Sequence, residues 1–483
     1  MPFKPVVLWT DLLVFLLIGV LIAAAIHTRR REHLLAPWKK VARSVYGMCA
    51  LVVLLAFLAV GLLDSLHFRS KLPGESGQVN YAPEVLSVFD LLAAPMRKKV
   101  EKTYSAPLSL HSFAKETVTH ADGTQTREFP RLRHGGTHLK DSATDHVTDV
   151  ARKAIGGLGL ALVTWLVVVI LTIATIARRQ ATTPSAVYAA MLRGQTDIPW
   201  RAMFVTLAVM LCALGPALAL SGHYHVMGTD KVGQDVLYQA LKSIRTGLVI
   251  GTLTTLIMLP FALALGLAAG YFGGWIDDVI TYLYTTLNSI PGVLLIAASI
   301  LLSQAWVDRH PGLFETVTER ADVRLLFLCL ILGITSWTGL CRLLRGEALK
   351  LREADYVQAA HALGVSHMRI ALRHLLPNVM HIVLIVIVMD FSGLVLAEAV
   401  LSYVGIGVDP SMISFGTMIN NARFELAREP MVWWSLAAAF FFMFVLVLSA
   451  NLFADAVRDA LDPRLRSGWS LTLSRARAMG RRT

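Results

Sequence analysis

The histidines and carboxylates that could support catalysis or metal binding are scattered along this sequence. Histidines are frequent between residues 111 and 146, and the last three of them, His134, His138 and His146, at first suggest a metal site. No carboxylate or thiolate joins them at the spacing of a metal-ligand set, and the surrounding segment is simply polar. The sequence therefore predicts no metal centre.

The chain also lacks the usual means of holding ATP. The phosphate-binding loop of most ATP-hydrolysing proteins ends in Gly-Lys-Ser/Thr, and no Gly-Lys pair occurs anywhere in the sequence. A membrane-embedded hydrolase would need His, Asp, Glu or Ser clustered at one depth, and no such cluster is visible. We therefore expect no enzyme. If ATP drives this protein, a partner hydrolyses it.

Two acidic residues lie inside an apolar run, where a charge is costly. Asp390 is about eleven residues into the run 379–403, roughly 16 Å along a helix and near the middle of a bilayer. Glu398 follows two turns later. Charged groups in membranes usually face the bundle interior or an aqueous cavity. Asp390 is the first candidate for a residue that lines a solute pathway, and Glu398 would either share that cavity or bond to a neighbouring helix. A purely structural role is the alternative for both.

These acids require a membrane bundle to position them, and the composition predicts one. Of the 483 residues, 55% are hydrophobic and only 16% are charged, with a mean hydropathy of +0.58, a balance foreign to soluble proteins. Spanning a bilayer takes roughly 20 mostly apolar residues. The sequence predicts an all-α polytopic bundle of about nine spans, at 10–26, 46–64, 156–177, 202–222, 245–270, 281–302, 324–342, 379–403 and 432–454.

Basic residues give the expected orientation, because Lys and Arg near span ends stay in the cytoplasm. They are concentrated after the first and third runs, in the loop 343–378 and in the tail after 454. This places the N-terminus outside and the C-terminus in the cytoplasm. Much of the net charge of +12 is then topological, which disfavours nucleic-acid binding.

The spans divide the chain unevenly. An N-terminal extension with two spans (1–64) precedes an external polar insertion (65–155) and a third span with a basic linker (156–201). Within the insertion, residues 115–129 alternate in character around Asp122-Gly123, which predicts a β-hairpin. Residues 202–454 carry six spans and the cytoplasmic loop 343–378, and 455–483 form a basic tail.

The loop 343–378 predicts two short helices joined by a glycine. Residues 352–363 favour a helix, Gly364 is placed to adopt a left-handed cap, and Ser366 to cap a second helix that runs to Pro377. We expect the paired alanines Ala359 and Ala360 to leave one face small enough for a partner's cleft. Pro377 would set a rigid direction at the junction with the next span.

This loop resembles the EAA coupling loop of ABC importer permeases. The resemblance rests on the spacing of Ala359-Ala360, Gly364 and Leu376-Pro377, although Gln358 stands where glutamate is common and His374 where isoleucine is common. The lead-in Leu351–Val357, which contains Glu353 and Asp355, and the stretch Arg373–Asn378 are similar to the C-type subunit of the dipeptide/oligopeptide (peptide/nickel/opine) permease family.

Further segments resemble the same branch in the same order. They are an external motif (Gly228, Asp230, Gly233 and Asp235), a turn at 270–277, and the stretches 401–416 and 457–464. Tyr282 and Thr285 stand where the branch often has a basic and an acidic residue. The resemblance covers about 200–466, so the extension and the insertion match nothing in it.

The resemblance implies a six-helix type I importer core in a bacterial inner membrane. It also implies as partners two ABC ATPase subunits, a homologous permease subunit and an external solute-binding protein. ATP and Mg²⁺ would be used by the ATPases, with no cofactor bound by this chain. The implied cargo is peptide. A nickel chelate, an antibiotic or an opine is the alternative cargo, and an ion-coupled secondary transporter is an alternative that only Asp390 favours.

Overall fold

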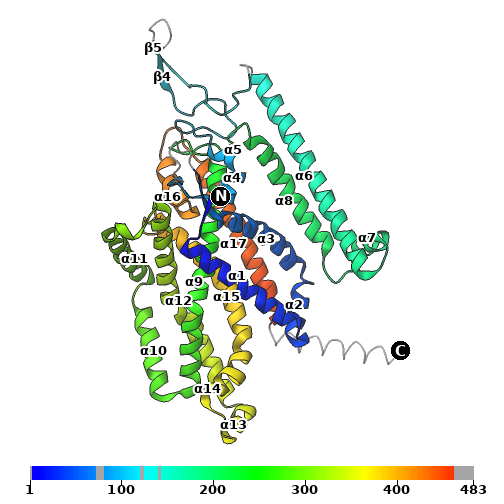
Figure 1. Ribbon diagram of the computed structural model, residues 1–483, viewed down its shortest axis with the longest axis vertical. Coiled ribbons are helices and arrows are strands. Elements are labelled where there is room, and N and C mark those ends of the chain that lie inside the picture. The colour runs from blue at the N-terminus through cyan, green and yellow to red at the C-terminus, as the bar shows by residue number, and fades with distance from the viewer. Residues whose placement is uncertain (1–2, 72–80, 120–124, 140–142, 462–483) are drawn as a thin grey trace.

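The computed structural model describes residues 3–71, 81–119, 125–139 and 143–461, and helices dominate it (Figure 1). Within these ranges, nine helices are long and apolar enough to cross a membrane, which confirms the predicted all-α polytopic bundle. They are α1 (Trp9–Arg29), α3 (Val45–Asp64), α6 (Ala143–Gln180), α8 (Trp200–Ser221), α9 (Val236–Phe272), α11 (Gly292–Arg309), α12 (Val317–Arg352), α15 (Leu376–Tyr403) and α17 (Trp434–Leu461).

Shorter elements connect these helices. The helical ones are α2 (Glu32–Val41), α4 (Val88–Leu92), α5 (Ala94–Arg97), α7 (Pro184–Leu192), α10 (Gly274–Ser289), η1 (Pro311–Leu313), α13 (Asp355–Ala362), α14 (His367–Ile370), the π-helical turn η2 (Ala371–Leu375) and α16 (Phe415–Glu425). The strands are β1 (Phe3–Val6), β2 (His67–Ser70), β3 (Leu86–Ser87), β4 (Glu116–Thr119) and β5 (Gln125–Glu128).

Polar segments gather at two opposite ends of the molecule (Figure 1). One end carries the strands, α4, α5 and α16, and we call it the insertion end. The other carries α13 and α14, and we call it the knob end. The tail 462–483, with the end of the motif 457–464, lies outside the described residues.

The long helices α9 and α12 pack side by side and connect the two ends. Glycines permit this close approach. A Cβ on Gly270 would lie 2.6 Å from the carbonyl oxygen of Arg345, and one on Gly266 would lie 2.9 Å from that of Cys341. Small residues at membrane-helix interfaces bring backbones together in this way.

The predicted single span at 281–302 is wrong. The chain breaks there into α10 and α11, with Ile290 extended (φ −86°, ψ 131°) and Pro291 at the start of α11. Proline has no N–H to donate and disfavours helical backbone in the residue before it. The helix α6 also begins at Ala143, so the last part of the predicted insertion is helical.

The predicted hairpin is confirmed, with β4 antiparallel to β5 and Glu116 opposite Glu128. Its Asp122-Gly123 turn lies outside the described residues. A second sheet, β1-β2-β3, was not anticipated. It pairs Phe3 with Ser70 and therefore holds the first described residues at the insertion end.

Candidate functional site

The knob of α13 and α14 is built around a left-handed glycine, as predicted. Gly364 has φ +75° and directly follows the end of α13, whose cap at Leu363 donates its N–H to Ala359. Ser366 is the N-cap residue of α14 and has an extended backbone, as predicted, but its side chain makes no capping hydrogen bond.

The outward face of the knob is apolar and larger than the sequence suggested. Ala359 is exposed, but Ala360 is buried and packs inward with Val357, so the two alanines do not form one small outer surface. Leu363 and Met368 instead project outward, 83% and 69% exposed. Apolar side chains displayed in this way on a polar segment mark protein contact sites.

The inner face of the knob is fastened to the bundle. Ile370 and Leu375 are fully buried against the ends of α9 and α12. The hydroxyl of Tyr271, at the end of α9, lies 2.9 Å from Nδ1 of His367. A cavity of about 370 Å³ separates α13 from the end of α9 and is lined in part by Tyr271, Gln358 and His361.

The second arm of the knob continues into a membrane helix without a break. After α14 the chain widens into the π-helical turn η2 and then enters α15, with Pro377 in its first turn. A wider turn accommodates a proline ring that would clash in a regular helix. The amide of Asn378 donates to the carbonyl of His374 (2.6 Å) and to the hydroxyl of Tyr356 (3.2 Å), so both arms are tied to this joint.

The other predicted loop residues lie in α13 or just before it. Glu353 pairs with Arg352 (3.1 Å), Asp355 is the first residue of α13, and the Gln358 amide lies 3.4 Å from the Glu353 carboxylate.

At the same end, Arg345 of α12 donates two hydrogen bonds, of 2.5 and 2.7 Å, to Asp277 of α10. A two-point pair of this kind fixes direction as well as distance.

The two predicted membrane acids have different surroundings. Glu398 is buried and accepts hydrogen bonds from Ser402 (2.7 Å) and Ser414 (2.8 Å), the latter at the cap of α16. Of the two roles expected for Glu398, these bonds favour the contact with a neighbouring helix over a place in the solute pathway. Asp390 is half-buried, and no side chain in the described ranges bonds to it.

The external motif forms a tight turn beneath the insertion. Gly228 and Gly233 have φ +72° and +76°, Asp230 accepts N–H bonds from Val232 (3.0 Å) and Gln234 (2.8 Å), and Asp235 caps α9. A Cβ on Gly233 would lie 1.9 Å from the carbonyl oxygen of Glu101. The insertion is therefore seated directly on the motif.

A buried charged cluster holds this contact. His225 lies 2.9 Å from Asp235 and 3.4 Å from Glu101. Burial alone would lower the pKa of His225, but the two carboxylates outweigh it and raise that pKa to about 9. Burial alone would raise the pKa of Glu101, but His225 and the backbone N–H groups of residues 133–135 lower it to about 2.

This cluster predicts a pH window for the insertion. Because the pKa of His225 is raised from 6.5 to about 9, its stabilisation is complete below pH 6.5 and is lost as the pH rises through 9. Hydrogen exchange at residues 101–105, corrected for intrinsic rates, should therefore rise between pH 7 and pH 10. His225→Gln should exchange fast throughout, while exposed His111→Gln should behave as wild type. A flat wild-type profile would contradict this role.

The histidines examined for metal binding take part in related contacts. The backbone N–H of His134 donates to Glu101 (2.7 Å), and the His138 ring lies 2.7 Å from Asp149 at the start of α6. His138 and His146 both contact the ring of Tyr224. Together these contacts join the insertion to α6 and to the segment before α9.

Sequence reasoning missed the charged groups that attach the N-terminal extension. Arg245 of α9 is buried and donates to Asp11 of α1 (2.6 Å), with Asp322 of α12 3.8 Å away. Thr10 joins Asp322 through its hydroxyl and through its backbone N–H (3.1 Å), and His67 of β2 lies 2.8 Å from Asp11. We call these five residues the Arg245 network.

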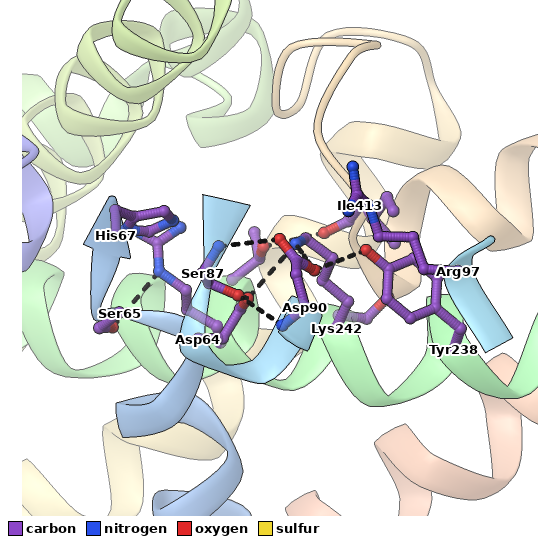
Figure 2. A network of polar contacts seen from close by, with 12 residues as sticks. Asp64, Ser65, His67, Ser87, Asp90, Arg97, Tyr238, Lys242 and Ile413 are labelled. Carbon is purple, nitrogen blue, oxygen red and sulfur yellow. Dashed lines mark hydrogen bonds and ion pairs between the residues drawn. The ribbon is translucent and has the colours of Figure 1, made fainter. Parts of the chain in front are cut away.

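One and two turns earlier on α9, a second set of bonds reaches the insertion. Figure 2 shows Asp90 accepting bonds from Lys242 (2.6 Å) and Tyr238 (2.7 Å), while Ser87 donates to Asp64 (2.6 Å). The sequence did contain one signal for these contacts, namely charged residues at the ends of apolar runs. Asp11 and Asp64 lie at the ends of predicted spans, and Arg245 is the first residue of another. Their pairing could not be deduced from spacing.

The nine membrane-length helices of the described residues, with an exposed helical knob continuous with one of them, define a multi-pass membrane protein. Residues 262–467 match the family model of the binding-protein-dependent transport system inner membrane component. The oligopeptide transport system permease protein of Mycobacterium bovis is 32% identical over 289 residues, covering 57% of this chain and 93% of the relative. The chain belongs to this family, and is a multi-pass permease subunit of an ABC importer.

Other similar proteins carry related names. A dipeptide transport system permease protein of Lactococcus lactis is 31% identical, covering 50% of this chain and 64% of the relative. A glutathione transport system permease protein of Pectobacterium atrosepticum is also 31% identical, covering 50% and 74%. Among solved structures, the inward-facing MetNI methionine ABC transporter aligns with 47% of this chain and 97% of its own at 16% identity, with a TM-score of 0.34.

Proposed function

We propose that this permease imports short peptides and that residues 353–377 are the contact through which partner ATPases drive it. The observation that carries the coupling role is the continuity of α14, η2 and α15, because a push on the knob is passed along one helical path into the membrane. The exposed side chains of Leu363 and Met368 supply an apolar contact for the ATPase.

The peptide cargo is supported by the relatives, whose names specify oligopeptide, dipeptide and glutathione transport. The partners in this proposal are two ABC ATPases, a homologous permease subunit and an external solute-binding protein. Because the sequence has no Gly-Lys pair, ATP and Mg²⁺ are assigned to the ATPases and no catalytic role to this chain. Half-buried Asp390 is assigned to the solute pathway.

The complex reconstituted in vesicles tests this proposal. We expect labelled di- to pentapeptide uptake that requires ATP and the binding protein, and that survives collapse of sodium and proton gradients. Uptake of chelated nickel but not of peptide would overturn the cargo and leave the coupling role intact. Gradient-driven uptake without nucleotide would overturn the coupling role itself.

In this proposal the knob end lies in the cytoplasm and the insertion end outside. The bias of Lys and Arg toward cytoplasmic loops supports it. In a variant lacking Cys49 and Cys212, the two partly exposed native cysteines, a membrane-impermeant maleimide should label Lys115→Cys in intact cells. It should label Met368→Cys only after lysis. The reverse pattern would invert the topology.

A further inference from the structure

A cavity away from the coupling path lies between the extension and α8, the first helix of the predicted core. It measures about 680 Å³, within the range of small-molecule sites. It opens where α3 begins, at Val45, and where α8 begins, at Trp200. Since both helices are candidate membrane spans, we expect the cavity at a membrane surface.

The rim of this cavity is cationic. Arg43 and Arg201 both line it, together with one carboxylate, Asp197. Asp197 is engaged by Arg43 at 2.6 Å. The side chain of Arg201 makes no hydrogen bond or ion pair with any residue in the described part of the chain, so one positive charge at the rim is unpaired.

The floor of the cavity is apolar and continues toward the membrane. Val45, Cys49, Ala202 and Val205 line it, and Val45 and Val205 are 47% and 57% exposed. Trp200 lies at the boundary between rim and floor, a position that indole rings favour at membrane interfaces. A water-soluble anion would use the rim but would gain nothing from this floor.

We propose that the cavity binds an anionic phospholipid, with its phosphate at Arg201 and Arg43 and an acyl chain along Val205 between α3 and α8. Basic pockets between membrane helices recognise anionic headgroups in this way. Such a lipid holds α8, the first core helix, against α3 of the extension. This inference does not depend on the solute carried.

The test is lipid retention by the intact complex, purified from membranes containing phosphatidylglycerol and phosphatidylethanolamine and examined by native mass spectrometry. We expect wild type to retain phosphatidylglycerol, and Arg43→Gln/Arg201→Gln to lose about tenfold or more of it. The matched control is Arg178→Gln/Arg179→Gln, which removes two arginines at the end of α6 outside the cavity, and it should retain lipid. Equal retention in both double variants, or equal loss, would overturn the proposal.

Two further experiments ask whether the bound anion is a lipid or a soluble ion, and whether a loss of lipid reflects only a damaged fold. Val205→Trp fills the floor at an exposed position, so it should reduce lipid retention without disturbing packing or the elution volume of the complex. In thermal-shift measurements, phosphatidylglycerol should stabilise the wild type, whereas inorganic phosphate and phosphatidylcholine should not. An equal shift with phosphate would show a soluble-anion site, and an equal shift with phosphatidylcholine a non-selective lipid contact. Either result would overturn the proposal.

Discussion

Gly364→Val should strongly reduce ATP-dependent uptake and weaken ATPase association while leaving membrane insertion intact. Gly364 has φ +75°, and nothing lies within 4 Å of the position that a Cβ would occupy. The defect therefore comes from the backbone alone. A left-handed conformation costs a β-branched residue about 1–3 kcal/mol, so the angle between α13 and α14 should be lost and uptake should fall about tenfold or more.

Two glycine variants make this result specific. Gly346→Ala, in the interior of α12 with open space around it, should transport normally because helical backbone suits alanine. Gly364→Asn should keep part of the activity, since asparagine tolerates left-handed backbone better than valine does. Peptide uptake and ATPase pull-down, measured for all three variants, test whether Gly364 is needed for coupling. Normal uptake by Gly364→Val would refute the coupling role.

Arg245→Met should destabilise the protein by about 3–5 kcal/mol, because it leaves buried Asp11 and Asp322 without their cation. The loss should appear as a large drop in the thermal unfolding midpoint of the purified protein. The exposed pair of Lys102 and Glu116 offers a matched control, and Lys102→Met should cost less than about 1 kcal/mol.

A double variant separates the buried charge from the lost packing. Adding Asp11→Asn to Arg245→Met removes one of the two unpaired carboxylates, so part of the lost stability should return. If Arg245→Met alone unfolds no earlier than Lys102→Met, the extension is not held by the Arg245 network. If the double variant is as unstable as the sum of its single variants, the charges do not interact.

The extension and the insertion are attached to the core through buried polar contacts with α9. The first helix of the extension and the insertion meet one stretch of α9, through Tyr238, Lys242 and Arg245, and the insertion also covers the external motif at Gly233. Fully paired buried charges resist separation, because parting them exposes each to an unfavourable environment. The extension is thus fastened to the core at the insertion end, opposite the knob.

Much of the membrane architecture could be predicted from local sequence. Apolar runs predicted the bundle because a bilayer demands about 20 apolar residues in a row, and the Asp-Gly hairpin and the Gly364 cap follow from backbone preferences of a few residues. The EAA-like loop could be recognised by spacing because its residues are close together in the chain. Pro291 indicated a break within 281–302, but the prediction of a single span followed the hydropathy of the run instead.

Tertiary structure alone decided which charges meet and which faces are turned outward. Asp11 and Arg245 are 234 residues apart, so no local pattern relates them. Ala359 and Ala360 are neighbours, yet only the packing of Ile370 and Leu375 against α9 and α12 determines that one is exposed and the other buried. The membrane bundle and the helix–glycine–helix knob were predictable from the sequence, because both follow from short-range preferences. The attachment of the extension required the fold, since long-range ion pairs exist only once the helices are packed.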